Sequence, residues 1–508
     1  MPFKLSPSPP KNKGTLLTKS RFVSGLQCPK WLWLSFNAPE RLPKTDEATQ
    51  HRFDEGHKVG ELAKSLFPDG IEIKETDTVK NHETTKKLLK ERKPLFEAGF
   101  KHKDGTCYAR ADILVPVGKN EWDIVEVKSA SSVKEDYIWD VAFQRHCYES
   151  VGLAIRNCFI MHVNSEYVRQ GTVNAAEFFV KADINDEVND ILSEVPKKKK
   201  ELFKIIALKE CPEFKKGEEY HEDESGVHDD DQFWKDHPEC DIFDLYYGGK
   251  KAIDLFNAGI LSIRDVEEHH FTKKQQKIQH RVAKTGEHHY DTEELRAFIE
   301  TLQYPLYFMD FETYATAIPL YDRVKPYQAL PFQFSVHVIE KKGAKSKHHS
   351  FIASGTNDPR PTFAKKLRAA LGTKGTILAY YQSFEKSRLK ELAEFFPEHA
   401  PWVEQVTERM VDLYDPFKNF SYYHPLQKGS ASLKNVLPAL TGKDHYGELD
   451  IGNGTDASLV YLHITHGSHN GKKPTAAEIK AVRAGLEKYC GLDTEGMIWI
   501  LDKLRGLI

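Results

Sequence analysis

The sequence lacks the features that would place a protein in a membrane or outside the cell. No apolar run approaches the roughly 18 residues that a membrane span requires. The start of the chain, Met1–Lys13, carries lysine and proline but no apolar core of a signal peptide. The seven cysteines are scattered and form no Cys-x-x-Cys pair, which argues against a disulfide framework and a simple zinc knuckle. These absences predict a reducing compartment, and we expect a cytoplasmic protein without membrane contact.

The sequence also lacks an excess of charge of one sign. Its net charge is −3, so no overall basic field indicates a polyanion partner, and any nucleic-acid surface must be local. No repeat at a fixed period occurs. The phosphate-binding motif Gly-x-x-x-x-Gly-Lys-Ser/Thr is also missing. A motor, if the reaction needs one, would therefore be a separate protein such as a helicase.

The length of 508 residues predicts two or three domains, and 40% hydrophobic with 29% charged residues describes a globular protein. Residues 1–15 are rich in proline and lysine and predict a disordered tail. Strands and helices alternate over 16–210, with a helix expected over roughly 78–98. An acidic, histidine-containing tract at 215–232 opens a linker over 211–300. The last region, 301–508, has strands first and helices later. We expect an α/β protein with a helical linker.

A first group of chemically suited residues lies on two consecutive predicted strands, 108–117 and 122–128. Asp112 belongs to the first strand, and Glu126 and Lys128 project from one face of the second. Two carboxylates can hold Mg²⁺, and a neighbouring ammonium can orient a water and stabilise charge on a phosphate. On Glu-x-Lys alone, the alternative is a cross-strand salt bridge at the rim of a sheet.

A second group begins in a short apolar run, Leu306–Thr313, which predicts a buried strand. Asp310 and Glu312 project from the same face of this strand, about 7 Å apart. Like charges at this distance repel unless a cation lies between them. For Asp-x-Glu alone, the alternative is an edge strand with a solvated acidic end.

Two later segments add to the second group. A strand at 376–381 leads into a helix with Ser383 as the predicted N-cap and Glu385 in the first turn. Tyr489 and Asp493 are four residues apart and share one face of a helix predicted over 476–504. Four carboxylates and a tyrosine suit a phosphodiester site with two metal ions. The ordinary pKa of tyrosine, near 10, makes Tyr489 a poor base, so it would position the attacking water.

The first group extends to an ordered set of motifs: Gly56-His57, Ala111-Asp112-Ile113, Val125-Glu126-Val127-Lys128 and Gln144-x-x-x-Tyr148. This order and spacing resemble the RecB-type branch of the PD-(D/E)XK nuclease superfamily, which has a restriction-endonuclease-like fold. The resemblance implies that Asp112 and Glu126 bind metal and that Lys128 is catalytic. It further implies that His57 is an additional metal ligand and that Gln144 and Tyr148 line the substrate side. The alternative for His57 is a structural role on its helix.

Relatives in this branch often carry an iron–sulfur cluster on four cysteines. Cys28 stands where the first of these would be, but only Cys211 and Cys240 follow the nuclease core before the third region. Three cysteines do not complete a four-thiolate cluster. We therefore expect no iron–sulfur cluster, with Cys28 packing as a small buried hydrophobe. The acidic tract could bind a divalent ion, although a solvated loop is the simpler interpretation.

The second group, with Asp-x-Glu first and Tyr-x-x-x-Asp last, resembles the DEDD exonucleases of the RNase H-like fold that have tyrosine in their third motif. The resemblance implies that Asp310, Glu312, Glu385 and Asp493 bind Mg²⁺ or Mn²⁺ and that Tyr489 is catalytic. Glu385 departs from the pattern, because that family usually has aspartate there. With segments 331–335, 412–414 and 430–434, the chain from Leu16 onward resembles a bacterial family that joins a RecB-like domain to such an exonuclease domain.

The linker holds a third candidate. Residues 253–266 resemble a helix-hairpin-helix, in which the turn at Gly259 would present backbone amides to phosphates. Lys273 and Lys274 would add local positive charge. The alternative is an ordinary helical hairpin that packs two domains together.

Together these observations predict a metal-dependent nuclease that acts on DNA. The N-terminal domain would cleave DNA and the C-terminal domain would remove nucleotides from 3′ ends, in end processing, repair or defence. One alternative is an exoribonuclease, since RNase H-like folds accept either polymer. Another is a nucleic-acid-binding module whose sites have decayed, as Glu385 and the missing cysteines would suggest.

Overall fold

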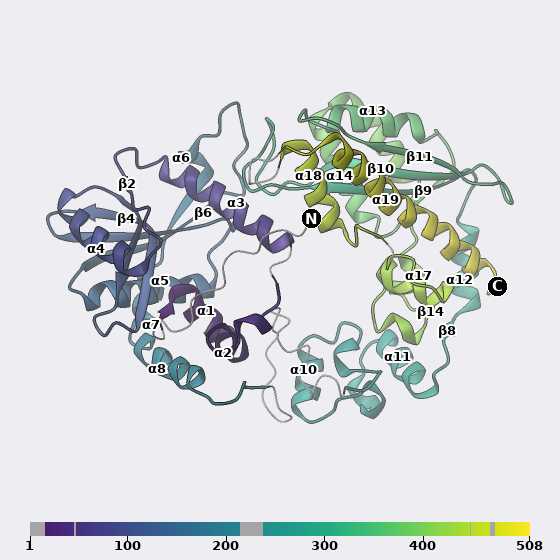
Figure 1. Cartoon of the computed structure of the whole chain (residues 1–508). Helices are drawn as coiled ribbons and strands as arrows, with labels where there is room; N and C mark the ends of the chain where they lie inside the picture. The colour runs from purple at the N-terminus through teal and green to yellow at the C-terminus, as the bar shows by residue number, and fades with distance from the viewer. Residues whose placement is uncertain (1–15, 45–46, 214–236, 448, 468–472) are drawn as a thin grey trace.

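The computed structural model describes residues 16–44, 47–213, 237–447, 449–467 and 473–508. The expected tail and the acidic tract, with its candidate ion site, lie outside these residues. Two large sheets, each accompanied by helices, form two lobes, and a smaller helical region follows the first lobe along the chain (Figure 1). The predicted mixed α/β class is confirmed. Among the described residues, we find no helix with the length and apolarity that a membrane crossing requires.

The N-terminal sheet has the order β2-β3-β4-β5-β6-β7, with the short β1 beside β4. Its strands are β1 Leu17–Thr18, β2 Ile71–Glu72, β3 Leu95–Lys101, β4 Cys107–Val117, β5 Glu121–Lys128, β6 Ala154–Val163 and β7 Phe179–Asp183. Strands β3, β4 and β5 form an antiparallel meander, whereas β6 runs parallel to β5. A parallel partner requires a crossover, and helix α5, Glu135–Ser150, provides it. The predicted strands at 108–117 and 122–128 are confirmed.

The other helices of the N-terminal lobe are α1 Lys19–Gln27, α2 Pro29–Asn37, α3 Glu47–Lys64, α4 Thr78–Leu88, α6 Ala175–Phe178, α7 Asn185–Leu192 and α8 Val195–Ile206. Between α1 and α2 the chain breaks at Cys28, because Pro29 cannot continue the first helix. The thiol of Cys28 accepts a hydrogen bond from the amide of Trp31 at 3.3 Å and so caps α2. Cys28 packs with Trp33 and Leu34, which confirms its expected role as a small buried residue.

One sequence expectation in this lobe was wrong. A helix was expected from Thr78 to Ala98, but α4 ends at Leu88, and a short 3₁₀ turn, Leu89–Glu91, precedes β3. Pro94 stands just before β3 and disfavours a helical continuation. The strand that follows is buried on both faces, so it lacks the polar alternation that would have identified it.

The central region is helical, with α10 Lys250–Asn257, α11 Lys274–Thr285 and α12 Thr292–Glu300. The predicted second helix of the hairpin is absent from the described residues there, since 263–265 form only a 3₁₀ turn. Gly259 has φ of +88° and ends α10. Its amide donates to the carbonyl of Phe256 at 2.8 Å, and that of Ile260 donates to the carbonyl of Leu255 at 3.0 Å. These two amides close the helix end, and the contact of the Gly259 turn with phosphates stays a prediction.

The C-terminal sheet has the order β11-β10-β9-β12-β13. Its strands are β9 Leu306–Tyr314, β10 Leu330–Ile339, β11 Lys347–Ile352, β12 Thr376–Ala379 and β13 Met410–Asp412, and a separate pair joins β8 His289–Tyr290 to β14 Tyr422–Tyr423. Strand β10 is antiparallel to both of its neighbours, whereas β12 runs parallel to β9 and β13 to β12. Strand β9 is therefore central, which confirms the buried strand predicted at 306–313.

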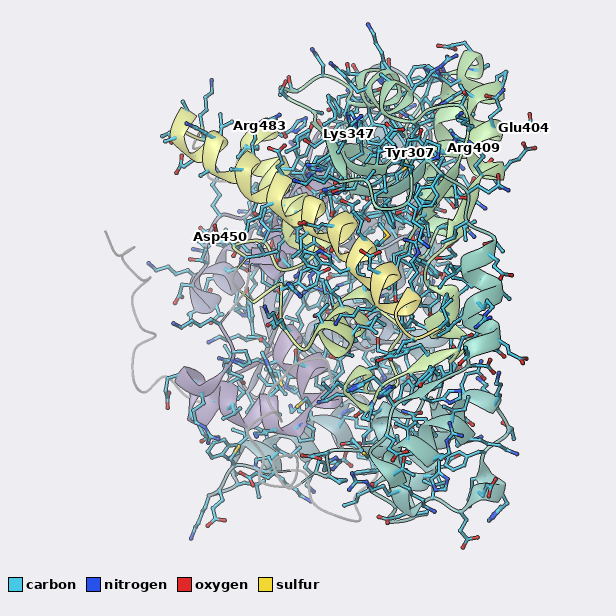
Figure 2. The ribbon with its side chains drawn as sticks, turned by 90° about the vertical axis from the view of Figure 1, so that its right-hand side faces the viewer. Tyr307, Lys347, Glu404, Arg409, Asp450 and Arg483 are labelled. Carbon is cyan, nitrogen blue, oxygen red and sulfur yellow. The ribbon has the colours of Figure 1, made fainter. Side chains whose placement is uncertain are left out.

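Helices cover both faces of this sheet: α13 Arg360–Ala370, α14 Ser383–Phe395, α15 Ala400–Glu408, α16 Asp415–Lys418, α17 Leu433–Thr441, α18 Gly454–His466 and α19 Ala476–Arg505. Tyr307, Met309 and Phe311 of β9 pack into the core with α13, α14 and α15. Leu306 and Phe308 pack on the other face, with α17 and α19. The long helix α19 crosses the lobe diagonally, with Arg483 in its N-terminal half (Figure 2). By strand alternation, Asp310 and Glu312 belong to the α19 face.

A loop after β9 joins the two lobes. The amide of Ala317 donates to Glu55 of α3 at 2.9 Å, and Ala317 packs in the same apolar cluster as Val59. Arg169 of the N-terminal lobe donates to the carbonyls of Pro319 and Leu320, each at 2.7 Å. The strand that carries Asp310 and Glu312 thus continues directly into the contact with the N-terminal lobe.

Candidate active sites

The N-terminal candidate site lies where β4 and β5 run side by side. The pairing of Ile113 with Val125 places Asp112 next to the strand segment that carries Glu126 and Lys128. These three side chains line a cavity of about 790 Å³. His57, exposed on α3, lies on the wall of the same cavity. The structure therefore brings together every metal and catalytic residue that the sequence predicted for this lobe.

The carboxylate of Glu126 is buried at 2% exposure and is fully hydrogen-bonded. Its Oε1 accepts from Lys19 at 2.6 Å and from Lys128 at 2.9 Å, and its Oε2 accepts from Gln144 at 2.9 Å. Burial alone would favour the neutral acid, but the two lysines hold the pKa of Glu126 well below its ordinary value. Glu126 is therefore a carboxylate at neutral pH.

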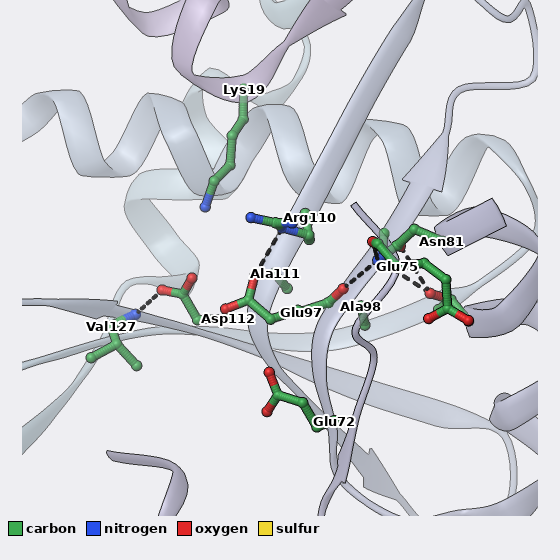
Figure 3. Close-up of polar contacts among 12 residues, drawn as sticks. Lys19, Glu72, Glu75, Asn81, Glu97, Ala98, Arg110, Ala111, Asp112 and Val127 are labelled. Atoms are coloured by element: carbon green, nitrogen blue, oxygen red, sulfur yellow. Dashed lines mark hydrogen bonds and ion pairs between the residues drawn. The ribbon is translucent and has the colours of Figure 1, made fainter. Parts of the chain in front are cut away.

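Asp112 has a different environment. Its Oδ2 accepts a hydrogen bond from the amide of Val127 at 2.7 Å, and Lys19 of α1 extends toward it from above the sheet (Figure 3). Burial, and then the neighbouring charge of Glu126, raise the pKa of Asp112 to about 7. A divalent cation beside Asp112 would offset both effects, because it favours the ionised form. Asp112 and Glu126 offer oxygen donors that such an ion accepts, and the imidazole of His57 lies on the wall of the same cavity.

The sequence did not identify two charged residues of this site. Lys19 comes from the first helix, and Asp140 comes from α5, where it accepts from Lys128 at 2.7 Å. Asp140 also accepts from Gln144 at 3.0 Å. Neither residue belongs to a recognisable spacing with Asp112 or Glu126. Lys19 in particular lies far upstream, so only the folded chain identifies it.

Gln144 and Tyr148 lie behind the site and do not face the cavity. Both side chains are fully buried. The Tyr148 hydroxyl donates to the carbonyl of Ala98 at 2.5 Å and accepts from the amide of Ala111 at 2.7 Å. This placement is at odds with the predicted contact between these residues and nucleic acid. Gln144 orients the carboxylates, and Tyr148 fixes the backbone of β3 and β4 beneath them.

The C-terminal candidate site gathers residues from strand β9 and helix α19. Ligand atoms of Asp310, Glu312 and Cys490 all lie within 4.8 Å of one another. The thiol of Cys490 lies 3.3 Å from Oδ2 of Asp310. Asp493, 7% exposed, follows one turn later on α19. The shared helix face predicted for Tyr489 and Asp493 therefore points at the two carboxylates of β9.

Glu385 reaches this site from the first turn of α14. It is 2% exposed, and its Oε2 has no hydrogen-bond partner among the described residues. Burial, and then the charges of Asp310 and Asp412, raise its pKa well above the ordinary value. The predicted N-cap was wrong, since Ser383 is already helical. Asp412 instead accepts from the amides of Tyr381 and Gln382, at 2.8 and 3.1 Å, and fixes the start of the helix.

All four carboxylates of this site have raised pKa values. Burial, followed by mutual repulsion, raises the pKa values of Asp310 and Glu312 well above their ordinary values. Burial raises that of Asp493 to about 6, although the hydroxyl of Tyr446 donates to it at 2.5 Å. The ammonium of Lys434 lies 5.7 Å from the ring centres of both Tyr446 and Tyr489. Lys434 and Arg388, the two cations that act on these groups among the described residues, do not balance four carboxylates.

The donor chemistry of this site fits divalent metal ions. Carboxylate oxygens are the preferred ligands of Mg²⁺ and Mn²⁺, and the unpartnered Oε2 of Glu385 is a free acceptor in a buried position. A cation there would remove the repulsion that raises the pKa values of the carboxylates. The N-terminal site differs, because two lysines already neutralise Glu126 and Asp140. Sequence spacing did not reveal Tyr446 and Cys490 as members of the C-terminal site.

The lysines predicted to bind nucleic acid in the central region are engaged locally. Lys273 lies 4.6 Å from the ring centre of Tyr247. Lys274 forms an ion pair with Glu294 at 2.7 Å, and both side chains are exposed. Their contact with nucleic acid stays a prediction.

A comparison with protein families gives one match, to residues 307–432. The match is to a domain of unknown function, DUF2779. The matched segment begins in β9 and ends before α17, so it contains Asp310, Glu312 and Glu385 but neither Tyr489 nor Asp493. It covers about a quarter of the chain and assigns no activity. Among curated proteins, the search found no match.

Proposed function

We propose that this chain is a metal-dependent nuclease with two hydrolytic sites, one in each lobe. The observation that carries the proposal is the convergence of three buried carboxylates, Glu312, Glu385 and Asp493, with the partly buried Asp310. Among the described residues, only Lys434 and Arg388 act on them as cations. Gathering four carboxylates with so little counter-charge is costly, so such a cluster favours a role in binding cations. Tyr489 on the same face as Asp493 adds a hydroxyl that can orient a water.

The strand arrangements support the finer assignment of the two domains. In the C-terminal sheet, β10 alone runs against the other four strands of the order β11-β10-β9-β12-β13, as expected of an RNase H-like domain. In the N-terminal sheet, the meander β3-β4-β5 is followed by α5 and the parallel β6, as expected of a RecB-like nuclease domain. Both strand arrangements are analogies of fold only, so the proposed function rests on the site residues.

The residues of the C-terminal site have separable roles in the proposed hydrolysis. Asp310, Glu312, Glu385 and Asp493 would hold divalent ions, whose positive charge would favour ionisation of a water and stabilise the departing oxygen. Tyr489 orients the attacking water, since burial and nearby Asp493 raise its pKa further above neutrality and exclude it as a base. Tyr446 keeps Asp493 oriented through its hydrogen bond.

The N-terminal site uses a lysine in place of the tyrosine. Asp112 and Glu126, with His57, would hold a Mg²⁺ or Mn²⁺ ion at the cavity wall. The ammonium of Lys128 remains protonated, because burial lowers its pKa less than Glu126 and Asp140 raise it. It therefore stabilises negative charge that develops on a phosphate and does not act as a base.

DNA is the proposed substrate, with 3′-end trimming at the C-terminal site and a role in end processing, repair or defence in the cytoplasm. A separate helicase would supply unwound strands if the reaction requires them. RNA is the rival polymer at the C-terminal site, and a decayed binding module is the rival to activity. Retention of all predicted metal and catalytic side chains within each site favours activity over decay.

The test is hydrolysis of 5′-labelled single- and double-stranded DNA and RNA with Mg²⁺ or Mn²⁺. Wild type is compared with Lys128→Ala, Asp310→Ala and the double variant. Two variants serve as controls, Lys58→Ala on α3 and Asp502→Ala on α19. Each removes an exposed charge from a helix that also carries a site residue. We expect a 3′-shortening ladder that Asp310→Ala abolishes and a separate activity that Lys128→Ala abolishes. Tight binding without hydrolysis of any substrate would refute the proposal in favour of a binding module.

A further inference from the structure

Two tyrosines near the C-terminal site are exposed to solvent and have unfavourable backbone conformations. Tyr247 is 66% exposed and Tyr381 is 57% exposed. Their φ angles are +46° and +68°, a region that residues with a Cβ rarely occupy. Such strain persists where the surrounding structure imposes it, and it gathers at ligand-binding positions. Burial of the rings is not the reason for the strain, since both rings lie outside the core.

Tyr381 lies at the sheet edge that carries the catalytic candidates. It follows β12, and Tyr414 follows β13, so both lie at the carboxyl ends of strands parallel to β9. Glu312 lies near the same end of β9, and Glu385 follows Tyr381 by one helical turn. Asp412 accepts from the amides of both Tyr381 and Tyr414, at 2.8 and 3.1 Å. The two rings are nearly perpendicular, with centres 5.6 Å apart.

Tyr247 reaches this edge from the central helical region. Its neighbour Tyr246 is buried, packs on Phe420 with ring centres 4.8 Å apart, and donates to the carbonyl of Lys418 at 3.1 Å. This anchor holds the adjacent Tyr247 at the surface of the C-terminal lobe. Burial, and then the neighbouring hydroxyls of Tyr247 and Tyr381, raise the pKa of Tyr414, which is consistent with the three side chains lying close together.

Cations accompany these rings. The ammonium of Lys273 lies 4.6 Å from the ring centre of Tyr247, and that of Lys418 lies 5.9 Å from the ring centre of Tyr414. Exposed aromatic faces beside lysines are the two elements that bind single-stranded nucleic acid, since bases stack on the rings and phosphates meet the ammonium groups. A duplex offers few free base faces, because its bases already stack on each other.

We propose that Tyr247, Tyr381 and Tyr414, with Lys273 and Lys418, form a platform on which unpaired nucleotides of a single strand stack as the strand enters the C-terminal site. We refer to these five residues as the tyrosine platform. The inference rests on the proposed function and deepens it, since it makes a single-stranded end the substrate of that site. The central region thereby contributes to substrate binding through Tyr247.

The experiment measures the binding of a 5′-fluorescein-labelled 12-nucleotide single strand by anisotropy, in full-length protein whose two proposed sites are both silenced by Lys128→Ala and Asp310→Ala. The double change Tyr247→Ala with Tyr381→Ala is expected to weaken binding roughly twentyfold or more, because each stacked base is lost. The matched variant Tyr247→Phe with Tyr381→Phe keeps the rings and should bind within about twofold of its parent. Affinity for a blunt duplex of the same sequence should not change. Circular dichroism confirms that each variant is folded.

A second comparison uses strands with abasic sites near the 3′ end. Removing the bases should weaken binding to the parent but have little further effect on the alanine variant, because the same contacts are already absent. Equal affinities of the alanine and phenylalanine variants, or additive losses with the abasic strand, would overturn the platform. Trimming by otherwise wild-type protein, measured in parallel, separates the two proposals. If wild-type protein trims the strand but the alanine variant binds it as tightly as its parent does, the platform is refuted and the nuclease proposal is not. If the alanine variant loses affinity for the single strand but wild-type protein does not trim it, the nuclease proposal is refuted and the platform is not.

Discussion

The carboxylate cluster of the C-terminal site should destabilise the metal-free protein as pH rises, and Asp493→Asn should relieve this effect. Asp493 is 7% exposed, and its pKa is raised from an ordinary 3.8 to about 6. At 1.36 kcal/mol for each pH unit, this shift corresponds to about 3 kcal/mol. The asparagine keeps a carbonyl oxygen that can accept from Tyr446, so the variant removes the charge and preserves the hydrogen bond.

The sign follows from proton binding. Between about pH 4 and pH 6, Asp493 is protonated in the folded state and ionised in the unfolded state. The free energy of unfolding therefore falls as pH rises through this window. Above it, Asp493 is ionised in both states and no longer makes the free energy of unfolding depend on pH. The raised pKa values of Asp310, Glu312 and Glu385 act in the same direction. Without metal, Asp493→Asn should be more stable than wild type at pH 7.5 by up to about 3 kcal/mol and nearly equal at pH 4.

The assay is urea unfolding at pH 4, 6 and 7.5 with EDTA or Mg²⁺. Because a chain of several domains does not unfold in one step, hydrogen exchange in α19 is followed as the local probe. Mg²⁺ at a hundredfold excess over its Kd should stabilise wild type by about 2.7 kcal/mol and the variant much less. Asp502→Asn, an exposed change on the same helix, should match wild type. Lower stability of Asp493→Asn at pH 7.5 in EDTA, or equal stabilisation by Mg²⁺, would refute the reasoning.

Two further changes test the parts of the sites that the sequence did not reveal. Lys19→Met removes one of the two cations beside Glu126, so the N-terminal site should bind divalent ions more tightly, while the free energy of unfolding falls by about 1–3 kcal/mol. Calorimetric titration in the Asp310→Ala background measures the affinity for the ion. Lys58→Met is the control. Tyr446→Phe removes the hydrogen bond that lowers the pKa of Asp493, so the acid limb of the C-terminal pH–rate profile should move upward by about one pH unit. Unchanged affinity in the first case, or an unmoved acid limb in the second, would contradict these assignments.

Local pattern was sufficient to predict the elements that carry the sites. Alternation placed Glu126 and Lys128 on one face of β5, and helical spacing placed Tyr489 and Asp493 on one face of α19. In both cases a period of the backbone fixes the direction of the side chains, so no tertiary information is needed. For Gln144 and Tyr148 this rule is insufficient. Helical spacing puts the two side chains on one face of α5, but it does not show that this face points into the lobe, and the substrate-side position came from the resemblance alone.

The remaining site residues depend on long-range packing. Lys19 meets Glu126 only because α1 packs beside α5 over the sheet, and Asp412 replaces Ser383 at the start of α14 because β12 and β13 are neighbours. No spacing in the sequence records either contact. The error at β3 has a similar origin, since a strand buried on both faces has no polar alternation to distinguish it from a helix.

The loop that follows β9 contacts structural elements of both candidate sites. Strand β9 carries Asp310 and Glu312, and the loop that follows it places Ala317 against Glu55 and hydrogen-bonds Tyr327 to the carbonyl of Ser129. Ser129 is the residue after Lys128. A displacement of this loop would therefore act on the end of β9 and on the end of β5 together. Because Ala317 is also fully buried among residues of the N-terminal lobe, separating the lobes would expose apolar surface on both. Activity measured on an isolated lobe would report a site that has lost part of its support, so each site is best assayed in the full chain with the other silenced by substitution.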